Sequence, residues 1–158
     1  MTLNQVLKRI QTLALGHKQV RSYRKGLVSD LFADKTALYP AVCLQDNNGS
    51  ISLGGHQATL NFRLFVFDLV HVSEDTKTNE DDVLSDTLSI LMDLLAQMNN
   101  GNYSDWKISS DNSFQFLVEA ENDMPAGVVI DISISFINAQ NVCEVPTEIE
   151  EYTTTDNG

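Results

Sequence analysis

The sequence predicts an α+β domain, in which a largely antiparallel β-sheet has two main α-helices packed on one face. Two segments, residues 3–15 and 79–98, repeat apolar residues at helical spacing. Several other segments alternate or are continuously apolar, and most are joined by links of hairpin length. The expected order is one helix, three strands, a second helix and three more strands, which indicates an α+β domain.

The first helix is predicted by its cap as well as by its period. Thr2 and Gln5 form a capping-box pattern, and Gly16 stands where a glycine often ends a helix. Between them the apolar residues recur three or four positions apart, and one side of the helix is therefore expected to face the sheet. These residues are Leu3, Val6, Leu7, Ile10, Leu13 and Ala14.

Three strands are expected after this helix. Residues 18–26 alternate weakly and have a basic outer face, and residues 27–40 form a connection with room for a helical turn. Residues 39–46 read as the second strand. The stretch "DNNGS", residues 46–50, is interpreted as a turn, after which residues 51–70 lead into the third strand.

The third strand, "TLNFRLFVFDLV", is apolar on both of its faces. Leu60, Phe62, Leu64 and Val66 would point to one face, and Phe65, Phe67 and Leu69 to the other. The two helices account for one covered face. We expect a neighbouring copy of the protein, or the curled remainder of the sheet, to cover the other. Arg63 and Asp68 are then expected to be edge or interface charges.

The second helix, residues 79–98, has the clearest pattern in the chain. Its apolar stripe is Leu84, Leu88, Leu91, Leu95 and Met98, widened by Val83, Ile90 and Leu94. The acidic residues Glu80, Asp81 and Asp82 lie in its first turn, where the helix dipole favours negative charge.

Further β-strands are predicted in the last third of the chain. Residues 103–110 and 113–121 are expected to form a hairpin joined at Asp111 and Asn112, and residues 126–137 alternate like a half-buried strand. We expect residues 1–146 to form a single α+β domain. Residues 147–158 are acidic and threonine-rich without a period, and they predict a mobile tail.

Length and composition suit an ordinary globular chain. The 158 residues are 42% hydrophobic and 20% charged, which is enough for one domain with its own core. No apolar run is long enough to span a bilayer and no signal peptide is recognisable, so we expect the protein to be made in a cytoplasm. Cys43 and Cys143 are interpreted as small buried hydrophobes in a reducing compartment.

The net charge of −12 is unevenly distributed. The first 35 residues hold seven of the ten basic residues and two acidic ones, which gives 7 − 2 = +5. The remainder holds three basic and twenty acidic residues, which gives 3 − 20 = −17. Such polarity suits docking between oppositely charged surfaces, or a place near DNA without tight binding. A soluble acidic protein with a basic first helix explains the charge equally well.

No catalytic, cofactor or metal site is predicted. His17, His56 and His71 are not spaced as metal ligands on a helix, and the chain has no phosphate-binding glycine loop. An acidic cluster lacks the glycine-centred spacing of a calcium loop and is interpreted as a solvated loop plus helix cap. Its members are Glu74, Asp75, Glu80, Asp81 and Asp82. The whole-chain charge also opposes sequence-specific DNA binding by the basic residues 17–25.

Several phrases together resemble a known family. They are "TLNQVLKRI", "VRSYRKGLVSDL", "YPAVCL", "LNFRLFVFDLV", the helix "NEDDVLSDTLSILMDLLAQM", and "PAGVVIDISISF" followed by "NVCEVP". Over residues 1–146 the chain resembles the tail-terminator, tail-completion and neck (head–tail joining) proteins of tailed bacteriophages. The resemblance rests on phrases and element order rather than on a catalytic signature.

The resemblance implies a structural virion protein without enzymatic activity or cofactor. Members form homo-oligomeric rings, often six- or twelvefold, that contact portal-connector or tail-tube proteins around the DNA channel. It implies synthesis in the host bacterial cytoplasm and a final place in the neck or tail of the virion, with DNA passing through unread and no membrane involved.

The charge pattern and the long strand give a candidate subunit or partner interface. Its residues are Arg21, Arg24, Lys25, Arg63, Phe65, Phe67, Asp68, Glu74 and Asp75. Head-to-tail ring contacts join two unlike edges, and a basic and an acidic edge would suit them. Two other functions stay open: a small acidic inhibitor or immunity-type module that binds a basic protein, and an enzyme with an unrecognised site.

Overall fold

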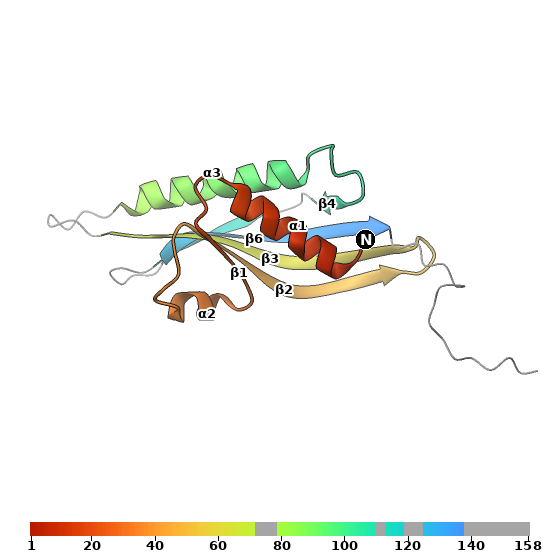
Figure 1. Ribbon diagram of the computed structural model, residues 1–158, viewed down its shortest axis with the longest axis horizontal. Helices are drawn as coiled ribbons and strands as arrows, with labels where there is room; N and C mark the ends of the chain where they lie inside the picture. Colours follow the sequence, from red (N-terminus) through yellow and green to blue (C-terminus); the bar gives the residue numbers. More distant parts are fainter. Residues whose placement is uncertain (72–78, 110–112, 119–124, 138–158) are drawn as a thin grey trace, which may run out of the picture.

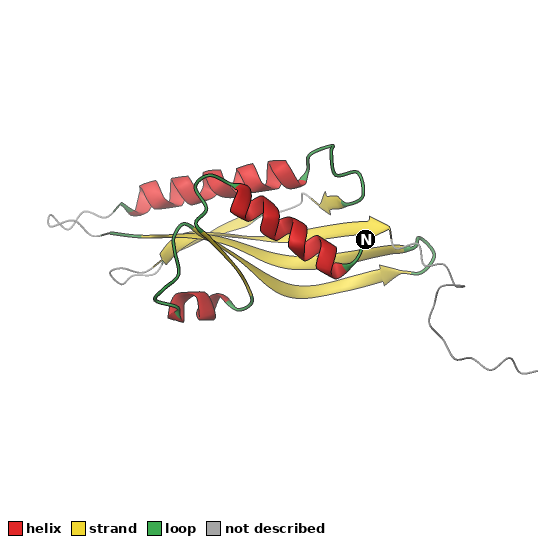
Figure 2. Ribbon diagram, viewed as in Figure 1, coloured by secondary structure: helices red, strands yellow, loops and turns green. Residues whose placement is uncertain are grey.

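A six-stranded sheet with helices on both faces forms the fold (Figures 1 and 2). The computed structural model describes residues 1–71, 79–109, 113–118 and 125–137. Within these residues the elements are α1 (Leu3–Gly16), β1 (Ser22–Lys25), α2 (Val28–Ala33), β2 (Ala41–Ser52), β3 (Gln57–Leu69), α3 (Glu80–Met98), β4 (Lys107–Ser109), β5 (Phe114–Leu117) and β6 (Pro125–Ile137).

The strand order is β1–β2–β3–β6–β4, with β5 also paired to β6. Only the β1–β2 pair is parallel among the described pairings, and the others are antiparallel. Helices α1 and α3 lie over one face of the sheet and the short α2 lies under the other (Figure 1). The predicted α+β class, with a largely antiparallel sheet and two main helices on one face, is confirmed.

The cap of α1 forms as its sequence predicts. Gln5 donates its backbone N–H to Thr2 Oγ1 (3.3 Å), and Thr2 donates its own N–H to Gln5 Oε1 (2.8 Å). Two backbone donors at the helix start are thereby satisfied, which fixes where the helix begins. Val6, Ile10 and Ala14 are the buried side of α1.

Helix α3 is anchored at both ends by side chains. Before its first turn, Asn79 Oδ1 accepts a hydrogen bond from the backbone N–H of His71 (2.7 Å), which ties the helix start to the region after β3. At its end, the indole Nε1–H of Trp106 donates to the carbonyl of Met98 (3.0 Å). This bond satisfies one of the carbonyls that a helix end leaves unpaired.

The main core lies between the α1/α3 layer and the sheet. One face of each long strand contributes to it: Val42 and Leu44 of β2, Phe62, Leu64 and Val66 of β3, and Val128, Ile130, Ile132, Ile134 and Phe136 of β6. These positions follow the period of two that the sequence shows for residues 60–66 and 128–136.

The second face of β3 is covered by the chain's own helix α2. Leu31 and Phe32 of α2 pack with Phe65 and Phe67 in a second core cluster that also contains Cys43. The rings of Phe32 and Phe67 meet edge to face with centroids 4.9 Å apart. Phe67 is 1% exposed, so the expectation that another copy or the curled sheet covers this face is wrong. The helical turn foreseen in residues 27–40 provides the cover.

The predicted turn at "DNNGS" is wrong. These residues belong to β2, where the pairing with β3 shifts between Asp46 and Gly49 in a β-bulge. A bulge absorbs the extra residue while both strands continue. The reversal comes later, between Ser52 and Gln57, where His56 has a positive φ of 47°. The glycine pair before His56, which the sequence marks as a turn, therefore makes this hairpin.

The predicted hairpin joined at Asp111 and Asn112 is also wrong. Strands β4 and β5 both pair antiparallel with β6, β4 opposite residues 133–135 and β5 opposite residues 127–130. They follow one another along the same border of β6 instead of pairing with each other. Alternation shows that a segment is extended, but it does not show which strand is its neighbour.

Candidate assembly surfaces and pocket

Arg63 occupies the middle of the sheet, on the face that carries α2. It pairs across the strands with Asp131 of β6, with Arg63 Nε 2.9 Å from Asp131 Oδ1. This hydrogen bond raises the pKa of Arg63. Because β3 is flanked by β2 and β6, Arg63 does not lie at an edge of the sheet, which corrects one of the two predicted alternatives. About half of its side chain is exposed, and the other alternative, an interface charge, stays a prediction.

The Arg63–Asp131 pair is one rung of a polar ladder between β3 and β6. In the next rungs Ser133 Oγ donates to Asn61 Oδ1 (2.6 Å), and the hydroxyls of Thr59 and Ser135 lie 2.8 Å apart. These pairs are directly opposite in the register, where cross-strand side chains interact best. The half of this face beyond α2 is therefore a hydrogen-bonded polar surface.

The aromatic members of the predicted interface are not available at the surface. Phe65 and Phe67 are 5% and 1% exposed beneath α2, which corrects their assignment to a contact between subunits. Asp68 is half-buried, and its Oδ1 accepts a hydrogen bond from the backbone N–H of Leu69 (2.8 Å). Glu74 and Asp75 lie outside the described residues.

The basic residues near β1 are partly neutralised within the molecule. Arg24 pairs with Asp34 (2.6 Å) and Lys25 with Asp46 (2.5 Å). The pKa of Asp34 is lowered, chiefly by hydrogen bonds from Thr36 and less by Arg24. The Arg24–Asp34 pair lies within the first 35 residues, whose net charge of +5 already includes Asp34, whereas Asp46 comes from outside them and compensates part of that charge. Arg21 is exposed.

One apolar surface, which the sequence reasoning missed, follows β5. Phe114, Phe116 and Val118 are 42%, 48% and 45% exposed, and the two rings meet edge to face with centroids 5.3 Å apart. The segment 113–118 contains no charged residue and no proline. Natural edge strands are normally protected by such residues. The alternation of Phe114, Phe116 and Val118 is visible in the sequence, but only the strand order shows that it lies at the border of the sheet.

A second apolar surface, Ile51 and Leu53, lies at the tip of the β2–β3 hairpin, and the register sets Ile137 of the adjacent β6 on the opposite face of the sheet from Ile51. Ile51 and Leu53 are 78% and 85% exposed, and Ile137, at the end of the adjacent β6, is 71% exposed. The hairpin extends past the N-terminal end of α1 (Figure 1). Register places Ile137 opposite Gln57, whereas Phe114 of the first surface lies opposite Ile130. Seven residues of strand separate these positions, roughly 23 Å.

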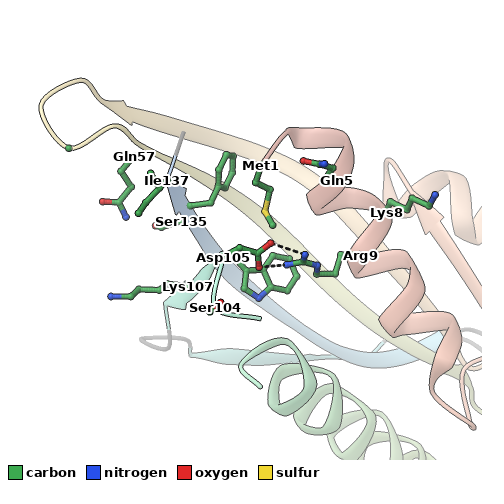
Figure 3. A pocket seen from close by; sticks show the side chains of 13 residues that line it. Met1, Gln5, Lys8, Arg9, Gln57, Ser104, Asp105, Lys107, Ser135 and Ile137 are labelled. Carbon is green, nitrogen blue, oxygen red and sulfur yellow. Dashed lines mark hydrogen bonds and ion pairs between the residues drawn. The ribbon is translucent and has the colours of Figure 1, made fainter. Parts of the chain in front are cut away.

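A pocket of about 750 Å³ lies beside this hairpin, under the first turns of α1 (Figure 3). It is lined by segments far apart in sequence, and no local pattern marks it. The lining residues are Met1, Gln5, Lys8, Arg9, Gly55, Gln57, Ser104, Asp105, Trp106, Lys107, Ser135, Phe136 and Ile137.

Arg9 organises one wall of the pocket. Its guanidinium binds both carboxylate oxygens of Asp105 (2.7 and 2.9 Å), as Figure 3 shows. It also lies 4.7 Å from the ring centroids of Tyr103 and of Trp106. A planar guanidinium suits both contacts, which lysine would not reproduce. The hydrogen bond from Arg9 lowers the pKa of Asp105, and the same bond raises the pKa of Arg9.

The described residues bring no obvious catalytic set together. Burial raises the pKa of Cys43 to about 11, so its thiolate, the form that acts as a nucleophile, is scarce at neutral pH. Burial also raises the pKa of Tyr23 to about 12, and its hydroxyl has no hydrogen-bond partner among the residues that the structure describes. Within the described ranges, no three side chains of the His, Cys, Asp and Glu types gather as they would around a metal ion. None of the helices described is long and apolar enough to cross a membrane.

Comparison with known proteins adds no relative to these observations. No protein-family model matches the chain, and no curated protein is significantly similar to it.

Proposed function

We propose that the protein is a structural subunit of a tailed bacteriophage, assembling as a homo-oligomeric ring at the neck or tail end around the DNA channel. The sequence resemblance to tail-terminator, tail-completion and neck proteins motivates the proposal. The α+β fold is compatible with it. In this proposal the protein acts without catalysis or cofactor, in contact with portal-connector or tail-tube proteins.

The observation that carries the proposal is the presence of two different apolar surfaces. The first is the β5 surface of Phe114, Phe116 and Val118, and the second is the hairpin-tip surface of Ile51 and Leu53. Side chains exposed to this extent in a row or at a tip favour contact with another protein. A closed ring needs two unlike surfaces on each subunit, because each copy contacts its neighbours head to tail. A twofold dimer would need only one.

The proposal is tested by the mass and shape of the purified protein. We expect light scattering to give a six- or twelvefold assembly, alone or on addition of tail tubes, and negative-stain images to show rings. The double variant Phe114→Glu/Phe116→Glu should remain monomeric, since it places charge in the β5 surface. Met92→Glu is the matched control, because Met92 is an apolar side chain of α3 that is 62% exposed and belongs to neither surface.

A wild-type protein that stays monomeric both alone and with tail tubes would overturn the proposal. Rings that form equally well from the double variant would also overturn it, because the exposed apolar side chains of β5 would then play no part in assembly.

One observation favours the alternative of an acidic binding module. Helix α3 contains five acidic residues, Glu80, Asp81, Asp82, Asp86 and Asp93, and no basic one. The negative charge of this helix would attract a basic protein. In that case the chain would bind its partner one to one, and the binding would weaken with salt and be insensitive to the β5 substitutions.

A further inference from the structure

We propose that the pocket beside the β2–β3 hairpin binds the acidic segment of residues 144–152 from the same molecule. The proposal is independent of the ring assembly. It rests on the charge of the pocket, its apolar surfaces, and the point at which residues 138–158 leave the described fold.

The pocket gathers positive charge in an otherwise acidic protein. Lys8, Arg9 and Lys107 line it, which is three of the ten lysines and arginines of the chain. The acidic residue in the lining is Asp105, and both of its carboxylate oxygens accept hydrogen bonds from Arg9. Lys8 and Lys107 are exposed, and neither has an ion pair among the described residues. In Figure 3 their side chains stand at opposite ends of the pocket and point outward, so an extended anionic segment that spans the pocket would meet one cation at each end.

Residues 138–158 have the complementary charge. They contain Glu144, Glu148, Glu150, Glu151 and Asp156 and no lysine, arginine or histidine. Elsewhere on a molecule of net charge −12 such a segment would meet mostly like charge. The pocket, with Lys8 and Lys107 at its ends, is a place in the described fold where the segment would meet opposite charge.

The segment and the pocket also both carry apolar side chains that could pack together. Between its acids the segment carries Ile149 and Tyr152, three residues apart. The pocket offers the side chains of Met1 and Ile137 and the edges of Trp106 and Phe136. A pocket of about 750 Å³ lies within the usual range of ligand pockets, roughly 300–1,000 Å³, and can receive such side chains. Apolar contact combined with flanking charge pairs is a common way to bind a peptide with a defined register.

Chain connectivity makes binding within one molecule efficient. Ile137, the last residue of β6, itself lines the pocket, so residue 138 begins at the rim. Ile149 is twelve positions after Ile137, which at about 3.3 Å per residue is enough chain to reach any point of the pocket. A short tether gives an effective concentration in the millimolar range. At that effective concentration, even a weak interaction between the segment and the pocket would be formed in most molecules.

Site-specific photocrosslinking in the full-length chain tests the proposal. A benzophenone amino acid replaces Ile149 or Tyr152, and the crosslinked peptides are identified by mass spectrometry. We expect crosslinks to peptides that contain residues 1–9 or 104–107. The double variant Lys8→Glu/Lys107→Glu should reduce their yield about fivefold, the effect of losing two partly screened charge pairs. Lys18→Glu/Lys35→Glu makes the same charge change away from the pocket and should leave the yield unchanged.

Charge exchange and isotope mixing complete the test. Glu148→Lys/Glu150→Lys combined with Lys8→Glu/Lys107→Glu should restore the crosslinks, and circular dichroism checks that each variant is folded. In a mixture of ¹⁵N-labelled and unlabelled chains, the crosslinked pairs should carry a single label. Pairs with mixed labels, crosslinks to other surfaces, or an equal loss in both double variants would each overturn the proposal.

Discussion

At the scale of single residues, Gly127 marks a place in the sheet with no room for a side chain. A Cβ atom at this position would lie 1.9 Å from the carbonyl oxygen of Val66 in β3. That oxygen belongs to the central strand, so relief requires a shift of the backbone rather than of a side chain. Gly127 therefore allows β6 to lie against β3 at the start of their long pairing.

Gly127→Ala should lower the free energy of unfolding by at least about 2 kcal/mol, because forcing extra atoms into a packed site costs about 1–3 kcal/mol even when side chains can adjust. Urea denaturation measures the change. Gly101→Ala is the control, since a Cβ there meets no atom within 4 Å. Equal stability of the two variants would mean that the strands separate at Gly127 at little cost.

The Arg9–Asp105 pair gives a residue-scale prediction about pH. The pKa of Asp105 is lowered in the folded protein, so the pair stabilises the fold above the ordinary aspartate pKa of about 4. That stability is lost as pH falls through the lowered folded pKa. Asp105→Asn should therefore cost about 0.5–1 kcal/mol at pH 7, a small value because the Asp105 side chain is 50% exposed, and almost nothing in strong acid.

Thermal or urea unfolding at several pH values checks this prediction. The variant Arg9→Gln and the double variant complete a thermodynamic cycle, which separates the pair from the stacking of Arg9 on Tyr103 and Trp106. A cost for Asp105→Asn that is the same at pH 2 and pH 7 would contradict the assignment.

At the scale of elements, α2 matters more than its six residues suggest. It is too short to be stable alone, and packing holds it in place. In return it keeps Phe65 and Phe67 out of water. Leu31, 1% exposed, is the side chain of α2 most deeply seated in this cluster.

Leu31→Ala should destabilise the protein by about 2–4 kcal/mol, the usual cost of truncating a buried leucine. Leu27→Ala, at the cap of the same helix but 56% exposed, should change stability by no more than about 0.5 kcal/mol. Denaturation curves of the two variants provide the measurement. A small effect of Leu31→Ala would indicate that α2 can leave the sheet without loss of the main core.

Element prediction from the sequence succeeded where the signal is local. The capping box at Thr2 and Gln5, the helix of residues 79–98 and the alternation of β6 each depend on one segment, and each is found in the structure. The buried side of α3 is shifted from the predicted stripe: Leu84, Leu88 and Leu95 are half-buried, and the fully buried residues are Val83, Thr87, Ile90, Leu91, Leu94 and Met98. The predictions at "DNNGS" and at Asp111 and Asn112 failed because turn-forming residues also fit a bulge or a strand interruption. Which strand pairs with which is decided by contacts between distant segments.

At the scale of the whole molecule, the sequence could not show how charges and cavities are arranged. The first 35 residues look strongly basic, yet Arg9 and Lys25 pair with carboxylates that lie 96 and 21 residues away, outside this part of the chain. The pocket likewise joins the first turns of α1, the hairpin, the segment before β4 and the end of β6. Such sites are formed by tertiary packing. Neither the amino-acid composition nor the spacing of apolar residues shows which distant segments will meet.

The position of Trp106 has a practical consequence. It is the single tryptophan of the chain, it forms part of the pocket wall, and Arg9 lies over its ring. Indole emission responds to nearby charge and to water, so the unlabelled protein contains an optical reporter of whatever enters this cavity. Ligands, solution conditions and variants can therefore be screened by intrinsic fluorescence, without a dye or a tag that would alter the surface under study.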